Sequence, residues 1–215
     1  MSLNDDNWNY FLMLEKEVEA TFDFVEPSIK NYSTFSISYA KLILSICGEF
    51  DSLLKDYCKD LSSKNQRPSN IQECFDVLKR CNSLNVLNTT VQLIRYSSIR
   101  LKPFGQWSSS SGYKKLSWWD CYNSIKHNRL TKFELANLEN CLNALAALFI
   151  INIVNSRLQN QHALFPTNNT IFAADHLFAR ILSGDYGSEL VIDENELKAM
   201  KEMSPAKVMI WRKSI

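Results

Sequence analysis

Four side chains able to bind anions or move protons lie close together in the chain: Asn123, Lys126, His127 and Arg129. On a helix, the spacing of Asn123 and His127 places an amide beside an imidazole. Such an amide can fix the tautomer of the imidazole, and both groups can hold a phosphate oxygen. Lys126 and Arg129 add positive charge nearby. We therefore expect this segment to bind a phosphate backbone, above all that of RNA.

These residues are predicted to lie on one short helix that begins at about Ser117. Ser117 as N-cap and Asp120 in the third position after it match the capping-box pattern. A rotation of about 100° per residue gives this helix one polar and one packed face. The polar stripe contains Trp119, Asn123, Lys126 and His127, and the packed stripe contains Trp118, Cys121, Tyr122 and Ile125.

A plainer interpretation stays open for the same helix. A histidine flanked by lysine and arginine is commonly a solvated surface group or a satisfied hydrogen-bond donor. The adjacent Trp118 and Trp119 point about 100° apart on a helix. We expect one of them to anchor the core and the other to cover a groove or an interface.

The order Tyr122, Asn123 and then His127 resembles the signature helix of the HEPN superfamily. In that family the motif is an arginine, a polar residue such as asparagine, and a histidine a few positions later. Asn123 and His127 match the last two, whereas Tyr122 stands where the arginine is expected. The resemblance implies an all-helical bundle that forms a homodimer, with the motif residues facing a shared cleft. It also implies metal-independent RNA cleavage, with His127 and Asn123 as the catalytic residues.

RNA cleavage without a metal needs a proton acceptor, a proton donor and positive charge against the phosphorane. His127 suits either proton-transfer role. Tyr122 cannot replace a planar, permanently charged guanidinium, so Arg129 or Lys126 would have to supply that charge. A member that binds RNA, a nucleotide or a protein without cleaving is an equally open prediction.

The composition describes one ordinary globular core. The chain has 215 residues, 46% hydrophobic and 22% charged, with a net charge of +1. That net charge provides no global attraction to nucleic acid, so any RNA binding must be local. The sequence predicts a mainly α protein: a helical bundle over residues 1–162 with a small β-hairpin insertion at 84–116, and a C-terminal appendage over 163–215.

The six cysteines have neither the paired spacing of a zinc site nor the density of a disulfide scaffold. Cys74 and Cys81 share a helical face, but buried, reduced thiols are the simpler interpretation for all six. We expect no metal and no cofactor. The N-terminus has no signal-peptide pattern, so a cytoplasmic protein without a membrane partner is expected. His162 and His176 are isolated and are taken as structural or exposed.

Apolar periodicity predicts four further helices in the bundle. The last contains an apolar run too short to cross a bilayer, and is expected to be a core helix opened by a Thr131 and Glu134 capping box. A cap at Ser69 with Gln72 is expected for the third. Charged residues on the second (Glu49, Asp51, Lys55 and Lys59) are interpreted as a solvated face unless they face His127. The four cover 8–24, 36–61, 70–80 and 132–159.

Between Val86 and Phe104 the pattern changes to short β-prone stretches, which the Ser97-Ser98 pair divides into a hairpin. A mobile serine-rich loop is expected to follow over 103–112. Its surroundings mix lysines with aromatic residues, which would suit phosphates and stacked bases. These are Lys102, Lys114 and Lys115 with Phe104, Trp107 and Tyr113. In the appendage, helices are expected at 173–182 and 194–203 and an edge strand at 207–211.

Two hypotheses of function follow. The first is a HEPN-like protein that binds or cleaves RNA as a dimer, with His127 and Asn123 at the site and Lys126, Arg129, Trp119, Tyr122, Lys114 and Lys115 as binding residues. The second is a non-enzymatic module in which the tryptophan-rich helix and the 103–112 loop form a groove for a protein or ligand. Tyr122 in place of arginine favours the second.

Overall fold

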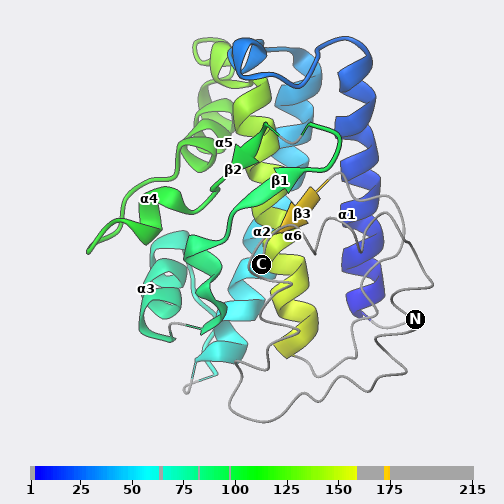
Figure 1. The fold of residues 1–215 in the computed structure, drawn as a ribbon. Helices are drawn as coiled ribbons and strands as arrows, with labels where there is room; N and C mark the ends of the chain where they lie inside the picture. The colour runs from blue at the N-terminus through cyan, green and yellow to red at the C-terminus, as the bar shows by residue number, and fades with distance from the viewer. Residues whose placement is uncertain (1–2, 63–64, 82, 97, 159–171, 175–215) are drawn as a thin grey trace, which may run out of the picture.

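The computed structural model describes residues 3–62, 65–81, 83–96, 98–158 and 172–174 (Figure 1). Within these residues the protein is mainly helical, with one small antiparallel sheet, which confirms the expected mainly α class. The expectations for His162, His176, the helix at 194–203 and the strand at 207–211 lie outside the described residues.

Three long helices form the centre of the fold: α1 (Leu3–Ala20), α2 (Ile37–Leu61) and α6 (Leu138–Leu158). Figure 1 shows α1, α2 and α6 side by side, with α2 and α6 crossing in this view and α5 (Ser117–Asn128) against the upper half of α6. Because α6 has neighbours on several sides, its own apolar residues lie all around the helix rather than on one stripe. The prediction of a buried core helix here is confirmed.

The apolar part of α6 is also long enough to be compared with a membrane span. Its 18 residues Leu138–Asn155 have a mean hydropathy of 1.4, and 83% of this stretch is buried inside the structure. By length and composition alone it could cross a bilayer. Its burial against α1, α2 and α5 is what a core helix requires.

The shorter elements connect and cover these helices. The 3-10 turns are η1 (Thr21–Asp23), η2 (Ile29–Asn31), η3 (Ser83–Asn88) and η4 (Phe133–Leu135), and the remaining helices are α3 (Ile71–Cys81) and α4 (Gly105–Ser108). The strands are β1 (Val91–Leu93), β2 (Arg100–Leu101) and β3 (Phe172–Ala174).

Side-chain caps decide where two of the helices begin. Ser36 accepts a hydrogen bond from the Tyr39 amide at 3.1 Å, so α2 begins where the sequence predicted. The predicted start of α6 near Lys132 is wrong. That helix begins at Leu138, because Asn137 Oδ1 accepts from the Asn140 amide at 3.0 Å.

Contacts with a segment that is distant in the sequence explain why α6 begins later than predicted. The backbone before it pairs with the segment that precedes α2: the Ser36 amide donates to the Ala136 carbonyl at 3.1 Å, and the Leu138 amide donates to the Thr34 carbonyl at 3.0 Å. This pairing holds residues 136 and 137 in a non-helical conformation, so α6 begins only at Leu138. A capping box at Thr131 therefore has no helix to cap.

The predicted hairpin is present, and a third strand extends it. β1 and β2 are antiparallel, with Val91 opposite Leu101. On its other edge β1 pairs with β3, where Ala173 lies opposite Gln92. The expectation that a helix begins at Ala173 is wrong for residues 173–174, because their backbone completes the sheet instead.

Candidate functional site

One face of α5 packs into the core, which confirms most of the predicted packed stripe. Trp118, Cys121 and Ile125 are each 2% exposed. Trp119 departs from the predicted polar stripe, since it is only 7% exposed and its ring lies 5.8 Å from that of Phe50 on α2. A wide apolar surface on α2 therefore buries both tryptophans, and Trp119 belongs to the core rather than to a binding surface.

The start of α5 is held by the segment before it. Trp118 Nε1 donates to the Pro103 carbonyl at 2.8 Å. Gln106 Oε1 accepts from the Ser117 amide at 2.9 Å and from the Ser117 hydroxyl at 3.3 Å. Ser117 is thus the first helical residue and not the N-cap, so the predicted capping box is wrong. The Gln106 side chain, from α4, caps the helix instead.

Replacing Gln106 by alanine should lower the free energy of unfolding by about 1 kcal/mol, the usual effect of losing one helix cap. The variant leaves the first amide of α5 without its protein acceptor. Gln106→Glu is the matched control, because a carboxylate still accepts from the amide and suits the positive end of the helix. Urea denaturation measures both variants. Equal losses in the two would show that the cap contributes nothing.

The aromatic residues of the 103–112 loop do not form an exposed stacking surface. Phe104 and Trp107 are fully buried, and Trp107 Nε1 donates to the Lys114 carbonyl at 2.7 Å. Tyr113 is half-buried, with its ring 5.8 Å from that of Phe75 on α3. The expectation that these rings stack on bases is therefore wrong for Phe104 and Trp107. They anchor the loop to the core.

The expected cations fall into two groups at opposite ends of α5. Lys114 and Lys115 precede its first turn, and the Lys115 ammonium lies 3.3 Å from Asp120. Lys126, His127 and Arg129 lie at its other end. A helix rises about 1.5 Å per residue, so the two groups are about 15 Å apart along the axis. They do not form one compact phosphate site.

The C-terminal end of α5 is the more open of these two groups. Lys126, His127 and Arg129 are all exposed, and none of the ion pairs among the described residues involves them. Positive charges at this end also interact favourably with the negative end of the helix dipole, so these side chains could serve only to stabilise α5. Asn123 is half-buried and donates through Nδ2 to the Trp119 carbonyl at 3.0 Å, within its own helix. The structure therefore satisfies the Asn123 amide without His127.

The Tyr122 ring lies between the Trp119 ring and the Lys126 ammonium. Its ring centroid lies 4.9 Å from that of Trp119, with the planes tilted by 44°. The ammonium of Lys126 lies over the same ring, 5.5 Å from the centroid. At an exposed position such a cation–π contact contributes about 0.5–1 kcal/mol. Tyr122 thus orients a neighbouring cation.

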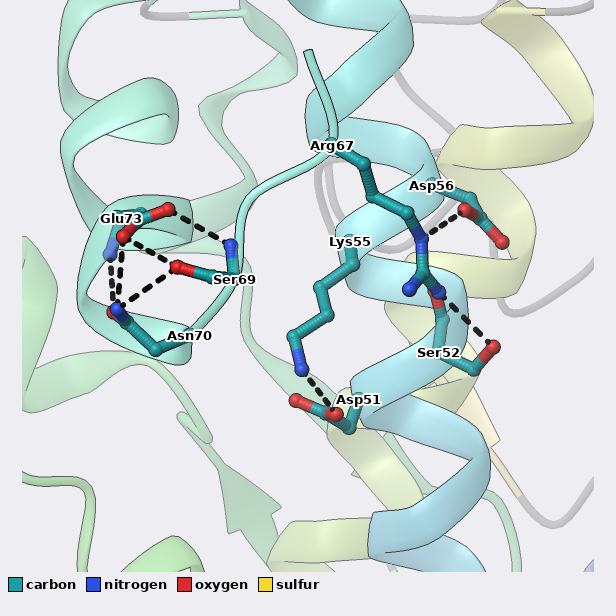
Figure 2. Close-up of polar contacts among 8 residues, drawn as sticks. All are labelled: Asp51, Ser52, Lys55, Asp56, Arg67, Ser69, Asn70 and Glu73. Atoms are coloured by element: carbon teal, nitrogen blue, oxygen red, sulfur yellow. Dashed lines mark hydrogen bonds and ion pairs between the residues drawn. The ribbon is translucent and has the colours of Figure 1, made fainter.

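A second polar cluster lies between α2 and the segment that leads into α3 (Figure 2). Arg67 Nε lies 2.7 Å from Asp56 Oδ1, and its guanidinium also donates to the Ser52 carbonyl at 3.3 Å. Lys55 pairs with Asp51 at 2.6 Å. The Arg67 contacts fix the connecting segment against α2, whereas the Lys55–Asp51 pair lies within that helix. Together these contacts show that Asp51 is already paired and that the expected solvated face of α2 is in part an ion-pair surface.

The cap of α3 is part of the same cluster and corrects the predicted one. The Glu73 carboxylate accepts from the Ser69 amide at 2.8 Å and from its hydroxyl at 2.6 Å, while Asn70 Oδ1 accepts from the Glu73 amide at 3.0 Å (Figure 2). Asn70, not Ser69, is therefore the cap of α3, and Glu73 rather than Gln72 is the residue that reaches back, to Ser69. The hydrogen bonds from Ser69 lower the pKa of Glu73. Its acceptors are used within the cap, so we assign the cluster a structural role.

Five of the six cysteines are buried, but Cys81 is exposed, so the expectation that all six are buried is wrong for Cys81. The Cys58 thiol donates to the Cys74 carbonyl at 3.7 Å, and the Cys81 thiol donates to the Leu61 carbonyl at 3.7 Å. Among the described residues no group of at least three histidine, cysteine or carboxylate side chains could hold a metal ion.

Fold and site together define a mainly helical protein with Lys126, His127 and Arg129 exposed at one end of α5. Comparison with protein-family models, with curated proteins and with solved structures finds no match to this chain. The function is therefore argued from the residues of this chain.

Proposed function

We propose that this chain is a HEPN-like helical protein that binds RNA through the C-terminal end of α5. The supporting observation is that Lys126, His127 and Arg129 are exposed together on one helix end, with no carboxylate paired to them among the described residues. Cations left without a partner are available for phosphate oxygens, and Arg129 can grip two of them at once. Dimerisation, as the family resemblance implies, is part of this proposal.

Binding is favoured over cleavage by the surroundings of His127. Its predicted partner Asn123 donates to a backbone carbonyl of its own helix, and an amide cannot transfer protons at neutral pH. The other hypothesis, a groove lined by the tryptophan-rich helix and the 103–112 loop, is not favoured. Trp107, Trp118 and Trp119 are all buried in the core and leave little surface for a ligand.

Reversing two charges tests the proposal. The double variant Lys126→Glu and Arg129→Glu should weaken binding of single-stranded RNA by at least about tenfold, because two phosphate contacts become repulsive. The slope of log affinity against log salt should also fall by about 1.4, since each phosphate contact on a single strand contributes about 0.7. Fluorescence anisotropy with a labelled oligonucleotide over a salt series measures both quantities.

The matched control reverses two exposed cations elsewhere, Lys16 on α1 and Arg100 on β2. It changes the net charge by the same amount and should leave affinity and slope close to those of the parent protein. Equal weakening in both double variants would mean that only overall charge matters, and the α5 site would be abandoned. RNA cleavage in the presence of a chelator, lost in His127→Ala, would instead make the site catalytic.

A further inference from the structure

Tyr122 has a ring face on the solvent side of α5. The ring is half-buried, and Trp119 packs against it from the core at 4.9 Å. Over the ring lies the ammonium of Lys126, whose side chain is exposed. A lysine on a flexible stem is easily displaced, so this face is covered only by a group that can move away.

We propose that Tyr122 stacks on a nucleobase of the bound strand and so selects single-stranded over duplex RNA. This inference rests on the proposed RNA binding at the end of α5. When a strand binds, the Lys126 ammonium moves from the ring to a phosphate oxygen, and a base takes its place on the ring. Both exchanges are favourable, because an ammonium binds a phosphate more strongly than a ring, and a base stacks on an aromatic face.

The ring is already held in place before any ligand arrives. Trp119 is anchored against Phe50 at 5.8 Å, and the Trp118 indole is tied to the Pro103 carbonyl at 2.8 Å. A ring fixed by packing loses little conformational entropy on binding. Every base offers a π face, so stacking tolerates different sequences. It does require an unpaired base, and the site should therefore prefer single strands to duplexes.

The test compares Tyr122→Leu with Tyr122→Phe in the full-length protein. The probes are a short oligouridylate and an abasic ribose-phosphate oligomer of equal length. Leucine keeps an apolar contact with Trp119 but removes the ring, whereas phenylalanine keeps the ring. Tyr122→Leu should weaken oligouridylate binding by about 5- to 150-fold, the range for one base stacked on one aromatic side chain. Its affinity for the abasic oligomer should not change, and Tyr122→Phe should bind both probes like the parent.

The outcomes separate this inference from the proposed function. If the parent protein binds neither probe, the proposed RNA binding fails. If it binds both and Tyr122→Leu binds oligouridylate as well as the parent, phosphate binding stands and base stacking is overturned. Equal weakening for both probes would also overturn stacking, because Tyr122 would then act only through structure. Photocrosslinking of a 5-iodouracil oligonucleotide to the parent protein checks the contact without any variant, and it should map to Tyr122.

Discussion

Trp107→Ala should lower the free energy of unfolding by about 3–5 kcal/mol, the usual cost of removing a large aromatic side chain from a core. Trp107 is fully buried, its ring lies 5.5 Å from that of Phe75 and 5.7 Å from that of Phe104, and its indole donates to the Lys114 carbonyl at 2.7 Å. The substitution removes this packing and the hydrogen bond to the Lys114 carbonyl. Urea denaturation followed by circular dichroism measures the loss as a lower midpoint with an unchanged slope.

The control is Trp107→Phe, which keeps an aromatic ring between α3 and the loop but removes the indole donor. It should cost about 0.5–1.5 kcal/mol, the usual net contribution of one hydrogen bond. The result also decides between two interpretations of the loop. A Trp107→Ala protein that unfolds like the parent and has lost RNA affinity would place this side chain at a ligand surface, as its sequence context predicted.

Only one of the six cysteines should react with a thiol reagent in the folded protein. Cys81 is exposed, and the other five are buried. The thiolate is the reacting species. Burial raises the pKa of Cys121 to about 12 and raises that of Cys47 and Cys141 well above the usual value. The buried thiols react only when the protein unfolds. Their labelling should therefore be more than about 1,000-fold slower than that of Cys81 in a domain of ordinary stability.

Labelling with an aromatic disulfide reagent, followed by mass spectrometry, measures this difference. The native protein should take up one label rapidly, and the urea-unfolded protein should take up six. Cys81→Ser should abolish the rapid reaction and leave the slow ones unchanged. Rapid labelling of Cys121 in the native state would contradict the packing of α5 against the core, because its Sγ lies 3.0 Å from the Leu135 carbonyl.

Local patterns predicted the elements of this fold well. The helical spacing of apolar residues located α2, and Ser36 correctly marked its start because the cap is made within one turn. Continuous apolar character predicted α6 as a core helix. The Ser97-Ser98 pair correctly separated the strands of the hairpin. Each of these features depends on residues that are neighbours in the sequence.

The helix that carries the proposed site was predicted from the sequence, but the contacts of its side chains depend on distant residues. Periodicity placed Trp119 on the polar stripe, whereas the rings of α2 bury it. Spacing suggested that Asn123 would orient His127, whereas its amide bonds to the Trp119 carbonyl. The role of Tyr122 beneath the Lys126 ammonium follows from a geometry that its residue type alone does not reveal.

The sequence by itself determined most of the α-helices and most of their apolar faces, because both depend on residues within a few positions of one another. Only the tertiary structure decided how α5 is capped and where α6 begins, since Gln106 from α4 and the backbone beside Phe35 supply those contacts. It also decided which aromatic rings are buried, because Phe50 and Phe75 come from other helices. Burial depends on partners brought together by folding, and a local pattern cannot specify them.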